Sequence, residues 1–346
     1  MLSLRDLNRT LLLRQHLLER ASMPAQAMVR HLVGLQGQES LPPYLSLAAR
    51  LTDFDPQELS RTLQHADTVR LLTMRGTIHV LTAEDALALR PWVQGALDQQ
   101  SAANANSRPA RGVPVPALVE AVDAVLAEGP LPVQQLGARL AERFAGVPAA
   151  ALAHVARERA PLVQLPPRGL WGRSGGVVYQ TVERHLGRAM TQVDVPELVR
   201  RYLRAFGPAT ASDMTTWSRV TRLGPVFASM REELVAVPCE DGRTRYDVPG
   251  APYAAGDRHA PVRLLGTYDN LWLSHSDRDR IAPADARSRW MGSNGGVANT
   301  VFVDGFLAGL WRRRDGRVEL EVPGRLTEAQ RAELHDEVAR LERILR

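Results

Sequence analysis

The stretch TVRLLTMRGTIHVL, residues 68–81, decides the fold that we predict for this chain. Its two halves, 68–73 and 77–81, are rich in β-branched and apolar residues, and Met74-Arg75-Gly76 separates them. This pattern predicts a β-hairpin whose turn contains the glycine. Before it, apolar residues recur at helical spacing over 4–18, 24–35, 45–50 and 56–64. Helices followed by a strand pair are the element order of a winged-helix unit.

The same order of predicted elements occurs twice more along the chain. In the second cycle, helices at 116–128, 133–144 and 148–159 precede strands at 162–165 and 170–181. In the third, helices at 195–206, 210–217 and 224–232 precede strands at 234–237 and 243–248. The cycles share little residue identity, so the repeat is one of structure. Three passes predict three winged-helix units.

The last third of the chain has a different pattern, with strand-like segments at 262–273, 301–311 and 317–322. Asp304-Gly305 and Asp315-Gly316 mark turns between strands. A closing helix is predicted from Thr327 to Leu345, where Thr327 and Gln330 have the spacing of a capping box. We expect a small, β-barrel-like domain with a terminal helix. The segment 101–116 is the best linker candidate because Ala, Asn, Ser, Arg and Pro dominate it.

These elements predict an α+β fold built from tandem winged-helix units and a C-terminal β domain. The predicted boundaries are 1–105 for the first unit, 106–190 for the second, 191–257 for the third and 258–346 for the β domain.

Composition limits the classes of function. The chain has 346 residues, 45% of them apolar and 23% charged, with a net charge of +5. All basic residues are arginines, whose planar guanidinium suits phosphate, so a polyanionic partner is permitted. The single cysteine, Cys239, excludes an internal disulfide and a cysteine-based zinc site. No apolar run approaches the ~18 residues of a membrane span. We expect a cytoplasmic protein.

Several common chemistries lack their sequence signatures here. The nine histidines show no metal-binding spacing, and the chain has no Gly-x4-Gly-Lys loop. We therefore expect no metal and no cofactor.

The segment Gln36-Gly37-Gln38 is the candidate site. On a helix these glutamines would point about 200° apart, at about 100° per residue. Gly37 and Pro42-Pro43 predict a helix end near Gly37, and beyond it an i, i+2 pair on extended backbone points to one side. The spacing therefore allows both amides to meet. The alternative is two solvated glutamines at a helix end, the commoner situation for this residue type.

Four motifs together resemble the AlkZ-like winged-helix DNA glycosylases. They are VGLQGQ at 33–38, TMRGTIH at 73–79, NLWLSHSDRDR at 270–280 and VFVDGF at 301–306, the last followed by Gly309 and Trp311. Their order and spread extend the resemblance over nearly the whole chain. It implies tandem winged helices and a β domain around a concave DNA channel. It further implies excision of alkylated purines, including bulky adducts and interstrand crosslinks at N7.

The resemblance also implies which residues act. A catalytic Gln-x-Gln defines one branch, and Gln36 and Gln38 match it, whereas a sister branch has aspartate at the second position. Alkylation at N7 makes the purine cationic and a good leaving group, so no general acid is needed. A glutamine carbonyl can hold a water near the anomeric carbon, although an amide is no strong base. We expect a monofunctional glycosylase that is active on cationic lesions and nearly inactive on uracil or hypoxanthine.

Further residues are candidates for contact with double-stranded DNA containing alkylated purines. Arg75, Thr77 and His79 belong to the first hairpin, Asp277 and Arg278 follow the 262–273 segment, and Arg312, Arg313 and Arg314 form a basic turn. Each set has an ordinary alternative. Arg75 would be a solvated tip and His79 a packed strand residue. Asp277 and Arg278 would form an internal salt bridge, and the arginine run would be an exposed turn.

Two other classes of function remain open from the sequence. One is a non-catalytic winged-helix regulator or architectural DNA binder, and the other is a small-molecule hydrolase. A regulator usually dimerises to bind two half-sites, whereas three unlike units in one chain suit a monomer on one duplex. Release of bases from alkylated DNA separates the enzyme from the regulator. A DNA-repair role would place the protein at the nucleoid.

Overall fold

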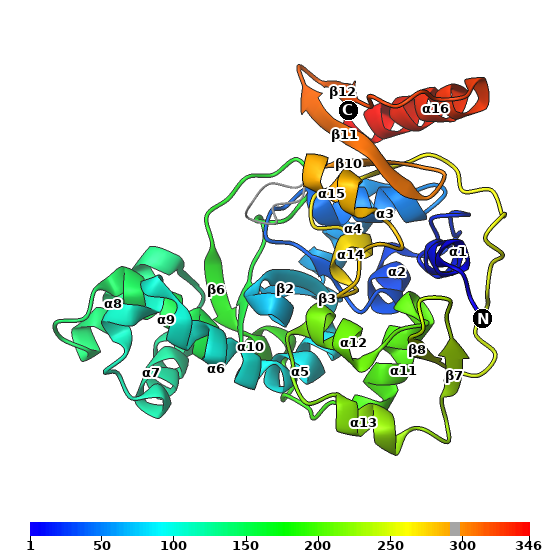
Figure 1. Cartoon of the computed structure of the whole chain (residues 1–346). Coiled ribbons are helices and arrows are strands. Elements are labelled where there is room, and N and C mark those ends of the chain that lie inside the picture. Colours follow the sequence, from blue (N-terminus) through cyan, green and yellow to red (C-terminus); the bar gives the residue numbers. More distant parts are fainter. Residues whose placement is uncertain (291–297) are drawn as a thin grey trace.

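The computed structural model of the chain describes residues 1–290 and 298–346, without the side chains of residues 289 and 290, and has an α+β fold (Figure 1). The N-terminal part places four helices before the first hairpin: α1 (Leu4–Arg14), α2 (Ala25–His31), α3 (Pro42–Arg50) and α4 (Pro56–Gln64). The hairpin strands are β2 (Thr68–Leu72) and β3 (Ile78–Thr82), in antiparallel register. The predicted hairpin is confirmed.

Two helices that follow the hairpin, α5 (Ala83–Trp92) and α6 (Gln94–Ala103), are absent from the sequence prediction. Pro91 lies inside α5 and neither helix carries a clear apolar stripe, because α6 buries only Leu97 and Ser101. One start signal was present: the Thr82 hydroxyl accepts a hydrogen bond from the Asp85 amide at 3.2 Å. The predicted linker is partly helical, with the 3₁₀ helix η2 at Ala105–Ala110.

The second part repeats the order of helices and strands. Its elements are α7 (Val115–Ala127), β4 (Leu131–Pro132), α8 (Val133–Arg143), α9 (Ala149–Arg159), β5 (Leu162–Gln164), β6 (Val178–Thr181) and α10 (Val182–Leu186). Of the strand predicted over 170–181, only the last four residues form a strand, β6. Residues 170–177 form a loop, in which Gly172 has a φ of 64°.

One six-stranded sheet joins the first two parts, in the order β1-β3-β2-β5-β6-β4, where β1 is Leu35–Gln36. Strands β2 and β5 pair antiparallel, with Arg70 opposite Gln164 and Leu71 opposite Val163. The hairpins of the two predicted units are thus continuous. The local sequence pattern could not predict this pairing, because the paired residues lie about ninety positions apart in the chain.

The third part consists of α11 (Val195–Phe206), α12 (Ala211–Ser218), α13 (Gly224–Ser229), β7 (Val235–Pro238) and β8 (Thr244–Asp247). The order matches the prediction, and α11 has the predicted bounds. Two short distances tie this part to α1: Arg14 Nη2 lies 2.7 Å from Asp247 Oδ2, and Arg14 Nη1 lies 2.8 Å from Oδ1, with both side chains buried. The assignment of the three parts as winged-helix units stays a prediction.

The C-terminal part contains β9 (Arg263–Leu265), α14 (Asn270–Leu273), α15 (Ala284–Trp290), β10 (Thr300–Val303), β11 (Phe306–Arg314), β12 (Arg317–Glu321) and α16 (Glu328–Leu345). Its sheet has the order β12-β11-β10-β9 and is open, so the predicted barrel-like closure is wrong for the described strands. The strand predicted over 262–273 is also wrong beyond Leu265. The Asp269 carboxylate accepts from the Leu271 amide at 2.9 Å and begins α14 instead.

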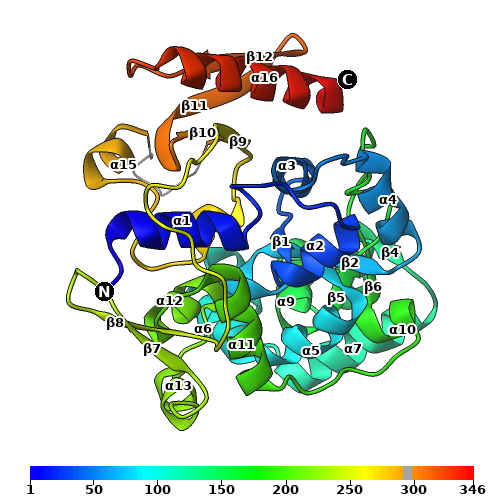
Figure 2. The ribbon, with the colours of Figure 1, turned by 90° about the vertical axis from the view of Figure 1, so that its right-hand side faces the viewer.

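Helix α16 packs beside this sheet (Figure 2), and Leu334, Leu341 and Leu345 are buried with Val301 and Trp311. Its capping box at Thr327 and Gln330 is present as predicted. The main apolar core links the first part, the third part and α14, whereas helices α7–α9 enclose a smaller core of their own. No helix in residues 1–290 and 298–346 is long and apolar enough to cross a membrane.

Candidate functional site

The chain reverses direction sharply before Gln36. Helix α2 ends at His31, four residues earlier than predicted, because the Gly34 amide bonds to Val29 O at 2.9 Å and the Val33 amide to Arg30 O at 3.2 Å. This pair of bonds is a Schellman end, and it places Val33 and Gly34 at φ 51° and 97°. The turn leads into β1, which pairs with β3 so that Gln36 lies opposite His79.

Gln36 belongs to a polar cluster between β1 and the first hairpin. Its side chain is buried, and its Oε1 accepts a hydrogen bond from Arg75 Nη2 at 3.0 Å. The same Arg75 nitrogen lies 2.9 Å from His79 Nε2, and Arg75 Nη1 donates to the Trp217 carbonyl in α12. The left-handed conformation of Arg75, at φ 56°, turns its side chain back to make these contacts. Arg75 is therefore not a solvated hairpin tip.

Burial sets the charge states in this cluster. Desolvation, followed by the nearby Arg75 charge, lowers the pKa of His79 well below its ordinary value, so His79 is neutral near pH 7. Its Nδ1 lies 3.0 Å from the Thr77 carbonyl and donates to it, which leaves Nε2 to accept from Arg75. Burial, and next Arg219, lower the pKa of Arg75 to about 9. No carboxylate within the described residues pairs with Arg75.

Gln38 is exposed and held by the same hairpin. Its Oε1 accepts from the Ile78 amide at 3.1 Å, and the Gly37 amide donates to the Ile78 carbonyl at 2.7 Å. The predicted pair therefore lies along β3, and each amide oxygen has one protein donor. Because an amide oxygen has two lone pairs, each retains capacity for a second donor.

Arg70 supports the peptide between the two glutamines, and the sequence analysis did not single it out. Its Nη2 donates to the Gly37 carbonyl at 2.7 Å, and its side chain is only 1% exposed. A Cβ at position 37 would lie 3.1 Å from Arg70 Nη1, which favours glycine there. Burial, and next Arg168, lower the pKa of Arg70 to about 10. The only sequence signal was a charged residue inside the apolar run TVRLL.

Thr77, Asp277 and Arg278 differ in how they relate to this cluster. Thr77 caps the hairpin turn, and its hydroxyl donates to the Met74 carbonyl at 3.3 Å. Asp277 Oδ2 lies 3.3 Å from Arg243 Nη1, so the alternative prediction of a salt bridge between Asp277 and Arg278 is wrong. Their loop touches α12, because the Ser276 amide donates to Asp213 at 3.0 Å. Helix α12 thus contacts both this loop and Arg75.

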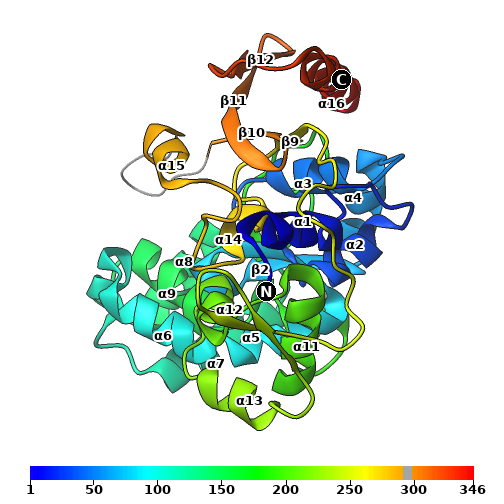
Figure 3. The ribbon, with the colours of Figure 1, turned by 45° about the vertical axis from the view of Figure 1, so that its right-hand side comes forward.

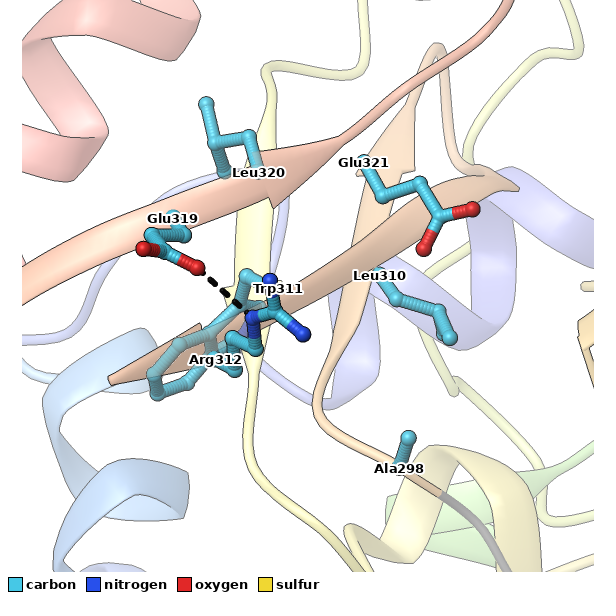
Figure 4. A pocket seen from close by; sticks show the side chains of 7 residues that line it. All are labelled: Ala298, Leu310, Trp311, Arg312, Glu319, Leu320 and Glu321. Atoms are coloured by element: carbon cyan, nitrogen blue, oxygen red, sulfur yellow. Dashed lines mark hydrogen bonds and ion pairs between the residues drawn. The ribbon is translucent and has the colours of Figure 1, made fainter. Parts of the chain in front are cut away.

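The basic turn lies apart from the glutamines. Arg312, Arg313 and Arg314 are exposed near the end of the β11–β12 hairpin, which lies at the opposite end of the molecule from α13 (Figure 3). Arg312 Nε lies 2.7 Å from Glu319 Oε2, and the two residues line a pocket of about 660 Å³ together with Trp311 and Leu320 (Figure 4). Arg313 donates to the Leu345 carbonyl at 2.9 Å. The predicted exposure is confirmed, but the three arginines belong to strand β11 and pair with β12 rather than forming the turn itself.

A model of the family described as DNA glycosylase AlkZ-like matches residues 29–344. The chain belongs to the AlkZ-like DNA glycosylase family. A relative from Streptomyces sahachiroi, named interstrand DNA cross-link repair glycosylase, is 26% identical over 320 residues, which cover 86% of this chain and 84% of the relative. The solved structure of the Streptomyces sahachiroi DNA glycosylase AlkZ has the same fold, with a TM-score of 0.81 and 23% identity over 99% of this chain and 97% of that one.

Membership of the AlkZ-like family makes this chain a DNA glycosylase. The alternatives of a non-catalytic regulator and a small-molecule hydrolase are therefore set aside. Within residues 1–290 and 298–346, no group of three or more His, Cys, Asp or Glu side chains is arranged to hold a metal ion. Gln36 and Gln38 lie inside the region that the family model matches.

Proposed function

We propose that this DNA glycosylase excises cationic N7-alkylated purines from double-stranded DNA, with Gln36 and Gln38 positioning the attacking water. The observation that carries this proposal is two glutamine amides held against strand β3, of which Gln36 shares the Arg75 guanidinium with His79, whose lowered pKa keeps it neutral. Neither the two amides nor the neutral His79 is a strong acid, so the cluster suits a leaving group that departs without protonation.

The reaction needs little from the protein besides orientation. The C1′–N9 bond breaks with its electron pair going to N9, so the cationic base leaves as a neutral molecule. The water oxygen then bonds to C1′, and its proton passes to solvent. A free lone pair on each amide oxygen accepts from this water and faces the positive charge on the sugar. Positioning of this kind lowers barriers by up to roughly 7–11 kcal/mol in ideal cases.

The chain composition supports a monofunctional enzyme. Glycosylases that also cut the strand form a Schiff base through an amine, and this chain has no lysine side chain. Abasic DNA is therefore the proposed product.

We propose a role for Arg75 within the site rather than at a phosphate. Its donors already contact Gln36, His79 and the Trp217 carbonyl. Arg75 therefore fixes the Gln36 amide with its carbonyl oxygen toward the site. Contacts with the DNA backbone come from Thr77, from the loop with Asp277 and Arg278, and from the exposed Arg312, Arg313 and Arg314. A monomer that binds DNA in this way would be found at the nucleoid.

Bulky adducts and interstrand crosslinks are the proposed natural lesions, because the relative in Streptomyces sahachiroi is named for cross-link repair. A crosslink at N7 leaves the purine as cationic as a methyl group does, so the same water-positioning chemistry applies to both.

Base release by variants of the pair tests this proposal. We expect Gln36→Ala and Gln38→Ala each to slow single-turnover release of N7-methylguanine by about tenfold or more, since each removes a water acceptor. Affinity for undamaged duplex should change by less than about twofold, because neither residue carries charge. Wild-type release of uracil, or full activity in both variants, contradicts the mechanism.

A further inference from the structure

A pocket of about 550 Å³ lies beside Gln38, between the first hairpin and helices α8 and α9. In the ribbon these helices lie next to β6 (Figure 1). Gln38 and Ile78 form the hairpin side of the pocket. The remaining wall comes from the second part, chiefly from α8, α9 and the β5–β6 segment, and includes Arg157, Gln164, Arg168 and Tyr179. Volumes of several hundred Å³ are typical of pockets that enclose organic ligands.

The charges that line this pocket are of one sign. Arg157 and Arg168 contribute guanidinium groups, and no aspartate or glutamate is among the lining residues. Arg157 contacts the His154 ring at 3.1 Å, and Arg168 donates to the Gly175 carbonyl at 3.2 Å. Within the described residues neither has a carboxylate partner. The buried Arg70 behind the hairpin adds to the same positive potential.

Gln164 adds a hydrogen-bond acceptor that lacks a donor. Its side chain is 7% exposed, and its Oε1 has no partner within the described part of the chain. A buried carbonyl oxygen costs free energy unless a donor reaches it. Because Gln164 lines the pocket, a ligand carrying an O–H or N–H group would satisfy that oxygen.

The apolar part of the lining leaves room for a flat group. Ile78, Val133, Val177 and Tyr179 supply apolar surface, and the side of α9 that faces the pocket carries the small residues Ala149, Ala150 and Ala153. The pocket thus combines apolar walls, two cationic donors and one unsatisfied acceptor. A cationic ligand would be repelled, whereas a neutral or anionic ligand with oxygen acceptors and one donor would be complementary.

We propose that this pocket receives the substituent on N7 of the damaged purine, and that it selects bulky, oxygen-bearing substituents that are neutral or anionic. This inference rests on the proposed function of Gln38. N7 and the glycosidic N9 belong to the same five-membered ring, so a group on N7 begins close to the bond that breaks. A substituent that starts beside Gln38 therefore has this pocket as its nearest space.

Filling the pocket tests where the substituent goes. Ala150 is exposed and lines the pocket on α9, so Ala150→Trp adds bulk to the pocket without replacing either glutamine. Ala145→Trp is the matched control, because Ala145 is exposed in the turn before α9 but does not line the pocket. Single-turnover release is measured from duplexes carrying N7-methylguanine or an N7-guanine adduct with a large hydroxylated aromatic group.

We expect Ala150→Trp to slow release of the large adduct by about tenfold and that of N7-methylguanine by less than about twofold, because only the large group needs the space. Ala145→Trp should affect neither. Equal loss on both lesions, or no loss on either, overturns the pocket assignment. Failure of the wild-type protein to release N7-methylguanine would instead overturn the proposed function itself.

The charge preference has its own test. Two adducts of equal size, one ending in a hydroxyl and one in an ammonium group, are compared on wild-type protein and Arg157→Gln. Wild type should release the hydroxyl adduct about tenfold faster, and Arg157→Gln should reduce that ratio to about threefold or less, because it removes one of the two cationic groups. A ratio near one in the wild type, or an unchanged ratio in the variant, contradicts the selectivity.

Discussion

At the scale of single residues, Arg70 is buried at a cost in folding free energy, and its side chain holds the peptide of the candidate site. A buried guanidinium without a carboxylate is unfavourable, and burial lowers its pKa to about 10. Arg70 has one strong contact, the 2.7 Å bond to the Gly37 carbonyl, while Nε and Nη1 have no partner within the described residues. The residue therefore contributes to the position of the peptide between Gln36 and Gln38 more than to stability.

Arg70 makes one strong hydrogen bond against the cost of a buried charge, so its removal should affect activity more than stability. Arg70→Met should slow release of N7-methylguanine by about tenfold while lowering the free energy of unfolding by less than about 1 kcal/mol, because the loss of one hydrogen bond is offset by removal of a buried charge. Urea denaturation and single-turnover release measure the two effects. Arg90→Met is the control, since Arg90 is equally buried but bonds to the Glu158 carbonyl at 2.9 Å, outside the cluster. Loss of activity in proportion to loss of stability would contradict the positioning role.

The pH dependence of catalysis is a second prediction at this scale. Gln36 and Gln38 do not titrate, and burial keeps the pKa of His79 well below its ordinary value. The single-turnover rate on a duplex carrying N7-methylguanine should therefore be constant within about twofold between about pH 6 and about pH 8. A tenfold rise with pH across that window would reveal a titrating base and exclude the amide mechanism.

At the scale of elements, the sequence predicted those segments whose signals are local. The hairpin over 68–81, helix α11 and the capping box of α16 all follow from periodicity or cap residues near the element itself. Helices α5 and α6 carry weak stripes, and the 262–273 run is divided because Asp269 caps a helix and pairs with the buried Arg50 at 2.7 Å. That contact spans 219 positions, which no local pattern records.

The candidate site was likewise predicted only in the part whose sequence signals are local. The residue types and spacing of Gln36-Gly37-Gln38 were sufficient to select the segment. The contacts that hold it come from Arg75 and Arg70, whose roles depend on a left-handed turn and on a buried strand position. Periodicity places such side chains on a strand or at a turn, but only the packed structure shows which carbonyl each one reaches.

A third prediction belongs to the turn before β1. Gly34 has a φ of 97°, and a Cβ there would lie 2.3 Å from Leu81 Cδ2 and 3.2 Å from the Val80 carbonyl. Gly34→Ala should lower the free energy of unfolding by about 2 kcal/mol or more and reduce base release, because φ is positive there and the buried Leu81 side chain must move within the core beneath β1. Gly187→Ala is the control, with φ 63° but open space around it, and should cost about 1 kcal/mol. If both variants lost the same free energy of unfolding in urea denaturation, the close contact between position 34 and Leu81 would have no effect on stability.

At the scale of the whole molecule, buried histidines connect stability to pH. Desolvation is the largest cause lowering the pKa of His79 and His275, and it lowers that of His16 to about 4. For His275 the nearby Arg280 acts in the same direction and Asp213 opposes it. All three are neutral in the folded protein near pH 6, whereas in the unfolded chain each takes up a proton below its ordinary pKa of about 6.5.

The unfolded state therefore binds more protons than the folded state from about pH 6.5 down to the folded pKa values, and stability must fall as pH falls through that window. We expect the free energy of unfolding from urea denaturation to be lower at about pH 5 than at about pH 7, by about 2 kcal/mol for each histidine that stays neutral in the fold. His16→Gln should reduce this difference, because it removes one of the histidines that the fold keeps neutral. His335→Gln should leave it unchanged, since the His335 side chain is 85% exposed. Equal stability at the two pH values would mean that these histidines are protonated in the fold, and the neutral state assigned to His79 beside Gln36 would then fail as well.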